Sequence, residues 1–285
     1  MKKRLVNIIK RILPQRLAAL RKNCGGRNRD IALFGGNLLN QGLSTAQYLQ
    51  IAGALIFRNG VRKSTHAGRN APVINAIFDH ERISFKAPVK VLDIGASLGI
   101  DAMGNLKTIE EHIPVESYTL GDLYTELHYD PEQKLLFDQD GNLLQILFYN
   151  HFVNLNFEFK YPLQKIVQCR NRKYTRRIAR TYKKVKPISN QIIQVPLVHP
   201  SVGSNPKFRM ERLDVFAPLK EKFDLIICMN LLQTRYFDKD EVNAGIRNLL
   251  NALRPGGVLI TGVTDQPRLF IGEQEIPFRL STKND

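Results

Sequence analysis

Two spacings of hydrophobic residues alternate along the chain, and they predict two kinds of element. Apolar residues at helical spacing predict helices over 99–113 and 238–253. An Asp140-Gly141 pair between two apolar runs predicts a hairpin over 133–149. Strands that alternate with helices favour an α/β fold with a mostly parallel, doubly wound sheet. Short, nearly continuous apolar runs predict the strands at 89–95, 116–123, 190–198, 209–216, 223–232 and 254–263.

The N-terminal part of the chain carries a helical pattern only. Apolar positions at helical spacing among Lys and Arg predict a basic amphipathic helix over 3–13, which ends at Pro14. Ser44 as a cap and Gly60 as a stop predict a second helix between them. We therefore expect three parts: a basic segment at 1–30, a helical region at 31–88 and a main domain at 89–285.

The clearest chemical signal follows the first strong strand pattern. The run VLDIGASLGIDAMG at 91–104 places an acid and several small residues at a strand-to-helix turn, where the backbone can approach a ligand closely. Asp122 and Asp214 follow two further predicted strands, at the edge where open parallel sheets bind ligands. The chain lacks both G-x-G-x-x-G at this turn and a phosphate-binding GxxxxGK[ST] loop. The pattern favours a nucleoside without phosphate.

Charge is distributed unevenly. The net charge is +16, and the segments 1–29 and 165–186 each hold ten Lys or Arg and no acid. Such blocks indicate an anionic partner, which could be a membrane surface, an acidic polymer or a nucleic acid. A solvated helix packed on its own domain is the simpler alternative for 165–186, because that segment carries an apolar stripe of Tyr174, Ile178, Tyr182 and Val185.

Cysteine content and hydropathy bear on location. The three cysteines, Cys24, Cys169 and Cys228, are far apart and odd in number, which favours a reducing compartment and no metal site. We expect Cys228 to be an apolar core residue. No apolar run reaches the roughly 18 residues that a spanning helix needs. We expect a cytoplasmic protein, and the polybasic N-terminus also allows a peripheral position at an anionic membrane.

Two motifs resemble those of the class I S-adenosylmethionine-dependent methyltransferases. VLDIGASLG at 91–99 resembles their first motif, and FDLIICMNLL followed by LRPGGVLITG resembles their fourth strand and the turn after the next helix. The run 223–262 is similar to the chemotaxis-receptor glutamate methyltransferases, which have an Asn after that strand and a Tyr-Phe pair a few residues on. Ser97 replaces the family's middle glycine, and Met229 replaces its Arg. The resemblance covers about half of the chain and implies a seven-stranded, Rossmann-like core.

The same resemblance implies S-adenosylmethionine as the cofactor. Asp93 would bind the methionine ammonium directly or through water, Asp122 the ribose and Asp214 the adenine. Each also has a structural interpretation, because an acid commonly ends a buried strand or begins a turn. The implied cofactor-binding residues are Asp93, Gly95, Ala96, Ser97, Gly99, Asp122, Asp214, Val215 and Asn230.

The acceptor side is less defined. Asn230 would face the sulfonium and the acceptor, with Arg235 and Tyr236 beside it, so the resemblance implies these three as catalytic residues. His151 and His199 are candidates for a general base. The basic stretch at about 123–205 matches no motif, and we expect it to be an insertion over the carboxyl edge of the sheet. Four functions stay open: methylation of a small-molecule, glycan or lipid-linked acceptor, of a protein carboxylate, or of RNA, and nucleoside binding without chemistry.

Overall fold

The computed structural model describes residues 67–130, 135–148, 151–154 and 192–278, together with Leu49, Leu55, Phe57, Lys63 and Thr65. The helices are α4 (Ala71–Phe78), α5 (Ile100–Glu110), α7 (Pro200–Gly203) and α8 (Lys239–Asn251). The strands are β1 (Val89–Ile94), β2 (Val115–Asp122), β3 (Glu126–Asp130), β4 (Leu135–Asp138), β5 (Leu143–Phe148), β6 (His151–Asn154), β7 (Ile193–Pro196), β8 (Phe208–Arg212), β9 (Phe223–Met229), β10 (Leu253–Val263), β11 (Gln266–Ile271) and β12 (Gln274–Ile276).

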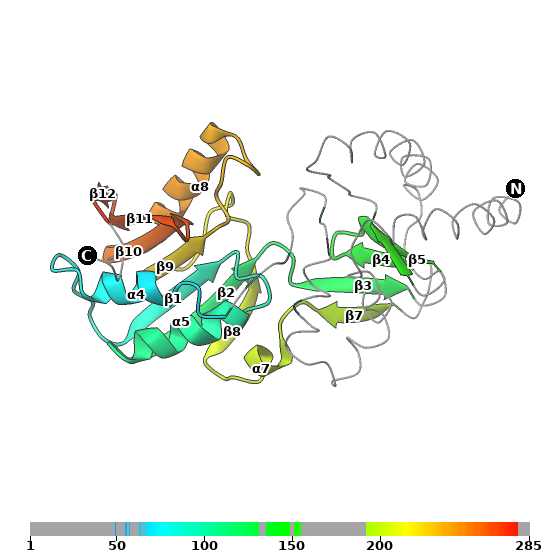
Figure 1. The fold of residues 1–285 in the computed structure, drawn as a ribbon, viewed down its shortest axis with the longest axis horizontal. Coiled ribbons are helices and arrows are strands. Elements are labelled where there is room, and N and C mark those ends of the chain that lie inside the picture. The colour runs from blue at the N-terminus through cyan, green and yellow to red at the C-terminus, as the bar shows by residue number, and fades with distance from the viewer. Residues whose placement is uncertain are drawn as a thin grey trace, which may run out of the picture.

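The larger sheet has seven strands in the order β12-β11-β10-β9-β1-β2-β8 (Figure 1). The five strands from β10 to β8 are parallel, whereas β11 and β12 add to the edge as antiparallel strands. Only Thr264 and Asp265 separate β10 from β11, and a connection this short joins antiparallel neighbours alone. The prediction of an α/β fold with a mostly parallel sheet is confirmed.

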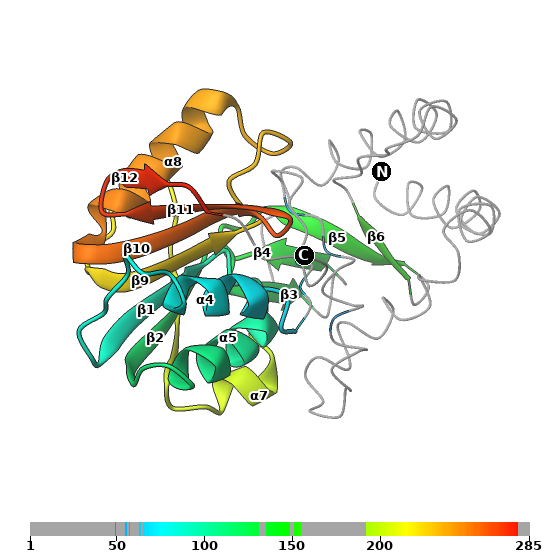
Figure 2. The same ribbon diagram turned by 60° about the vertical axis from the view of Figure 1, so that its left-hand side comes forward.

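Both faces of this sheet are buried, which explains the continuous apolar runs of its strands. Val91 of β1 packs into the core beneath α4 and α5, and the neighbouring Leu92 packs into the core beneath α8. Figure 2 shows α4 and α5 against one face and α8 against the other. Cys228 is fully buried among the α8-side residues, so its predicted place in the core is confirmed.

A second sheet, antiparallel and five-stranded, lies between β2 and β8 in the sequence, in the order β6-β5-β4-β3-β7 (Figure 1). The predicted hairpin is present as β4 and β5, and Asp138 accepts hydrogen bonds from the backbone N–H groups of Asp140 and Asn142 at its turn. The predicted strand at 190–198 is present as β7, which pairs with β3. The sequence did not predict a second sheet, because the period of a strand says nothing about its partner.

The structure describes few residues of the two helices that were predicted near the N-terminus. Leu55 and Phe57 are not helical, so the predicted helix from Ser44 to Gly60 is wrong at its C-terminal end. Both side chains are buried in the core of the second sheet, where the Phe57 ring stacks on Tyr124 with ring centroids 4.2 Å apart. Tertiary packing overrides local helix propensity here. The basic segments 1–30 and 165–186 lie outside the described residues.

Gly99, in the turn after β1, lies where both the backbone conformation and the packing require glycine. Its φ is +76°, and an added Cβ would lie 2.9 Å from Val202 Cγ1 and 3.1 Å from Leu120 Cδ1. Strain in the left-handed region and overpacking together predict that Gly99→Ala lowers the free energy of unfolding by about 2–4 kcal/mol. The matched control is Gly141→Ala, at φ +77° with no atom within 4 Å, which should cost only about 1 kcal/mol. Equal losses in urea unfolding would contradict the packing role.

Candidate functional site

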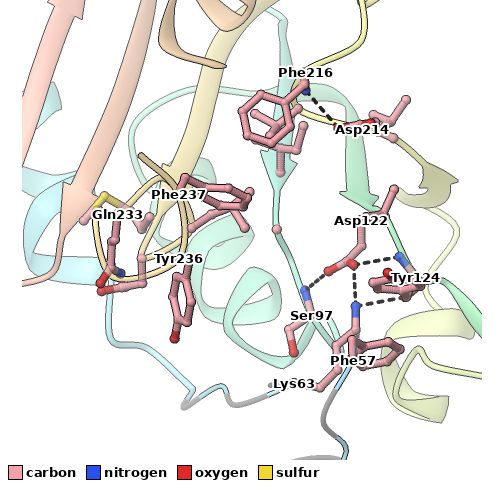
Figure 3. Close-up of a pocket in the computed structure, with 18 of the residues that line it drawn as sticks. Phe57, Lys63, Ser97, Asp122, Tyr124, Asp214, Phe216, Gln233, Tyr236 and Phe237 are labelled. Atoms are coloured by element: carbon pink, nitrogen blue, oxygen red, sulfur yellow. Dashed lines mark hydrogen bonds and ion pairs between the residues drawn. The ribbon is translucent and has the colours of Figure 1, made fainter. Parts of the chain in front are cut away.

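A cavity of about 490 Å³ opens at the carboxyl ends of the parallel strands (Figure 3). Segments that follow β1, β2, β8 and β9 line it, as do Phe57, Lys63 and Arg69 from the N-terminal region. This is the edge at which open parallel sheets bind ligands, because the connecting loops diverge there. Within the described residues, no three His, Cys, Asp or Glu side chains are arranged to hold a metal ion. None of the described helices is long and apolar enough to cross a membrane.

The turn after β1 supplies one wall of the cavity. Gly95, Ser97 and Gly99 all have positive φ, and for Ser97 the angle is +60°. Gly95 and Ser97 line the cavity, whereas Ala96 and Gly99 do not. An added Cβ on Gly95 would lie 2.9 Å from Leu231 Cδ2, so this position also needs glycine for packing. The buried Ser97 Oγ has no hydrogen-bond partner among the described residues, which leaves a polar atom for a ligand.

Asp122, at the end of β2, is the most strongly held acid of the cavity wall. Its Oδ2 accepts from Ser97 N at 2.9 Å, and its Oδ1 accepts from Tyr124 N at 3.0 Å. Lys63 Nζ forms an ion pair with the same Oδ1 and donates to the Tyr124 carbonyl oxygen at 2.9 Å. The Lys63 side chain is only 3% exposed. Asp122 therefore lies in the cavity wall as one half of a buried ion pair, which the sequence did not predict.

Asp93 lies behind the cavity wall. It does not line the cavity, because its Oδ2 accepts hydrogen bonds from Tyr118 Oη and Asn105 Nδ2 beneath the glycine turn. Burial raises the pKa of Asp93 to about 7, and the neighbouring Asp101 carboxylate adds to the rise. Direct contact between Asp93 and a ligand's ammonium group remains a prediction that this arrangement does not favour.

Asp214 and Val215 line the cavity beyond β8. Asp214 is exposed, and its Oδ1 accepts from the backbone N–H of Phe216 at 2.9 Å. Phe216 is 38% exposed and meets Phe237 edge-on, with ring centroids 5.0 Å apart. A carboxylate beside an exposed aromatic ring can accept from an amine of a planar group that stacks on the ring.

Asn230, at the end of β9, is the second non-glycine residue with a positive φ among those described, at +62°. Its Nδ2 donates to Thr264 Oγ1 at 3.0 Å, so the amide is fixed by the loop after β10. Arg235 lies over the Tyr236 ring, 4.9 Å from its centroid, and all three predicted catalytic residues line the cavity. Ser97 and Asn230 thus hold sparsely populated backbone conformations on one cavity, which is typical of functional sites.

Several cavity residues were missed by the sequence analysis. Phe57 belongs to a segment with helical spacing only, and Lys63 and Arg69 belong to no motif. Arg69 N and Nε both donate to the Asp101 carboxylate, which holds the guanidinium at the edge of the cavity. Phe216 could have been noticed as a large apolar residue two positions after a candidate ligand acid, Asp214.

Of the two candidate bases, the structure describes the side chain of His199 only, and it does not enter the site. His199 caps α7, where its Nδ1 accepts from the backbone N–H of Ser201, and it does not line the cavity. Burial lowers the pKa of His199. His151 begins β6, and its side chain lies outside the described part of the chain.

No family model matches the chain, and no curated protein matches it. The chain matches solved structures, among them several that are 12–16% identical to it. The N-methyltransferase NodS from Bradyrhizobium japonicum, in complex with S-adenosyl-L-homocysteine, is 16% identical over 61% of this chain and 52% of that one, with a TM-score of 0.27. CalS10 with S-adenosylmethionine bound, an amino pentose methyltransferase from Micromonospora echinaspora, is 14% identical over 69% and 50%, with a TM-score of 0.32.

A third match is an S-adenosylmethionine-dependent methyltransferase from Clostridium acetobutylicum, 15% identical over 69% of this chain and 50% of that one, with a TM-score of 0.32. The chain spans half or less of the length of the first three structures it matches, at 28%, 37% and 50%. All three of these proteins are methyltransferases, and at this identity they do not assign the chain to a family.

Proposed function

We propose that the cavity binds S-adenosylmethionine and that the protein transfers its methyl group to an acceptor. The proposal rests on one observation: a glycine turn, two strand-end carboxylates and a strained asparagine meet in a single cavity. Its volume, about 490 Å³, lies within the range of about 300–1,000 Å³ that is usual for small-molecule sites. The unpartnered Ser97 Oγ and the tight Gly95 turn fit a polar ligand that lies against the backbone.

The chemistry of the lining residues suggests an order for the parts of the ligand. Asp214 would accept from the exocyclic amine of adenine, whose ring would pack on Val215 and Phe216. Asp122 would hold the ribose. The methionine end would lie along the glycine turn, where Arg69 can pair with its carboxylate. Arg69 replaces Asp93 as the charged residue that we assign to the methionine end.

Bound S-adenosylmethionine supplies an electrophilic methyl group on a sulfonium centre. The protein's task is then to position the acceptor and to exclude water. Asn230, held by Thr264 at 3.0 Å, offers a fixed amide oxygen and amide N–H at the cavity wall. Tyr236 and Arg235 would bind the acceptor beside it. We also propose that the seven-stranded sheet is a Rossmann-like methyltransferase core.

The acceptor that we propose first is a small molecule, a glycan or a lipid-linked compound, modified near an anionic membrane surface. Protein carboxylate methylation of the chemotaxis type is the second candidate, because Asn230 and the Tyr236-Phe237 pair line the cavity. Met229 stands where that family has an arginine. Its side chain is uncharged and only 4% exposed, so it cannot take the role of the arginine. Methylation of RNA depends on the basic segments 1–29 and 165–186.

A methyl-transfer assay tests the proposal. The purified protein and S-adenosylmethionine with a tritiated methyl group would be incubated with small-molecule, lipid, glycan, protein and RNA fractions. We expect label in one fraction, at least tenfold less label with Asp214→Ala, and unchanged label with Asp140→Ala, which lies outside the cavity. The labelled fraction identifies the acceptor class. Tight binding without transfer to any fraction would leave the non-catalytic nucleoside-binding function instead.

A further inference from the structure

Lys63 is a buried cation on the wall of the cavity, and no motif predicts it. Its side chain is 3% exposed, and it comes from the N-terminal region rather than from a strand end. A buried lysine needs an acid partner, because an unpaired charge away from water is strongly unfavourable. Asp122 provides that partner at the position that we assign to a ribose. The ion pair between Lys63 and Asp122 therefore lines the proposed ligand site and also contributes to the stability of the fold.

The hydrogen bonds of Asp122 limit what the carboxylate can still accept. Each carboxylate oxygen can accept about two hydrogen bonds. The Oδ1 atom already receives Tyr124 N and Lys63 Nζ, whereas the Oδ2 atom receives Ser97 N alone from the described residues. One acceptor position, on Oδ2, is left for a ligand. A ribose could not donate both of its hydroxyl groups to Asp122 while Lys63 stays in place.

The hydrogen bonds of Lys63 leave a complementary position. An ammonium group has three N–H donors. Two of them are taken among the described residues, by Asp122 Oδ1 and by the Tyr124 carbonyl oxygen at 2.9 Å. The Phe57 ring lies 5.6 Å from Nζ and stacks on Tyr124, which fixes the direction in which the side chain enters (Figure 3). One N–H donor is left beside one carboxylate acceptor on the same wall.

We propose that Lys63 and Asp122 together recognise a vicinal diol: one hydroxyl donates to Asp122 Oδ2, and its neighbour accepts from Lys63 Nζ. This deepens the proposed function, on which it rests in taking the ligand to be a nucleoside. Lys63 is then a specificity-determining residue for the ribose.

Burial and charge act in opposite directions on Lys63. Burial lowers its pKa by more than the Asp122 carboxylate and their hydrogen bond raise it, so the pKa lies below that of an ordinary lysine. Asp122 opposes this fall, and the position of Nζ against two acceptor oxygens favours the ammonium form. The donor that faces the ligand therefore depends on the same acid that supplies the acceptor. Neither residue can recognise the diol without the other.

The test is calorimetric titration with S-adenosylhomocysteine and with its 2′-deoxy and 3′-deoxy analogues. We expect the wild type to lose about tenfold in affinity or more for each missing hydroxyl. Lys63→Met should weaken S-adenosylhomocysteine about tenfold. The same substitution should leave the affinity for one of the two deoxy analogues unchanged, namely the analogue that lacks the hydroxyl which accepts from Lys63. Lys63→Arg, which keeps a cationic donor, should retain part of the discrimination.

Four results would overturn the proposal. Equal losses for all three ligands in Lys63→Met would show a structural role only, and tighter binding would show that Lys63 competes with the ribose. If Lys63→Met does not fold, the double variant Lys63→Met/Asp122→Asn replaces it, because it removes both charges. We expect this variant to have no preference for a diol, and a retained preference would contradict the proposal. Adenosine and its deoxy analogues are titrated in parallel. Discrimination among adenosines without binding of S-adenosylhomocysteine would refute the proposed cofactor but not the diol site, and no binding of either series would refute both.

Discussion

Replacing Asp122 by alanine should have the largest effect of any single change in the site. Lys63 would be left as an unpaired buried cation, and the N–H groups of Ser97 and Tyr124 would lose their acceptor. Breaking a buried ion pair in this way lowers the free energy of unfolding by about 3–5 kcal/mol. The affinity for S-adenosylhomocysteine should fall about 100-fold, because a charged acceptor at the ribose is removed. Urea unfolding and calorimetry measure the two effects separately.

Two further variants distinguish folding from binding. Asp122→Ala/Lys63→Met removes both charges and should recover most of the lost stability, while its affinity should stay as weak as that of Asp122→Ala. Asp140→Ala breaks the exposed pair with Arg212, whose partners are 42% and 46% exposed, and should cost no more than about 1 kcal/mol. Wild-type affinity in a folded Asp122→Ala protein would refute the assigned role.

Asp93→Asn should change how stability depends on pH. The folded pKa of Asp93 is raised by burial from 3.8 to about 7, so between these values the folded protein keeps a proton that the unfolded chain has lost. Stability therefore falls as pH rises through this range and stays low above it. Each pKa unit corresponds to about 1.4 kcal/mol, so the stability of the variant relative to the wild type should increase by about 4 kcal/mol between pH 4 and pH 8.

The asparagine amide suits the position. The buried Asn105 Oδ1 has no partner among the described residues, and the substitution brings an N–H donor into the same network. Subtracting the wild-type curve from that of the variant removes the titration of groups that do not interact with Asp93. Urea unfolding at several pH values supplies both curves. A difference that stays constant from pH 4 to pH 8 would show that Asp93 is ionised throughout, as an ammonium-binding carboxylate would be.

The elements of the large sheet could be predicted because burial leaves a clear pattern in sequence. β1 and β9 are buried on both faces and appear as continuous apolar runs, and α8 was predicted from apolar residues at helical spacing. Pairing could not be predicted in the same way. β3 and β7 meet across more than sixty residues, and no periodic pattern identifies which strand is the partner.

The same limit applies to the site. Carboxylates and glycines at strand ends were visible, because topology alone brings the ends of parallel strands to one edge. Lys63 could not be found, since its role depends on a tertiary contact with Asp122. Asp93 shows a related limit: its position in the motif suggested a ligand contact, and only the structure shows that its side chain accepts a hydrogen bond from Tyr118.

Calorimetric titration of the wild-type protein with S-adenosylhomocysteine tests the central claim most directly. We predict saturable binding at one site per chain, weakened by Asp214→Ala and by Asp122→Ala/Lys63→Met, both compared with Asp140→Ala as the control. Absence of binding by a folded protein would contradict the claim and would leave the glycine turn as a packing feature of the fold.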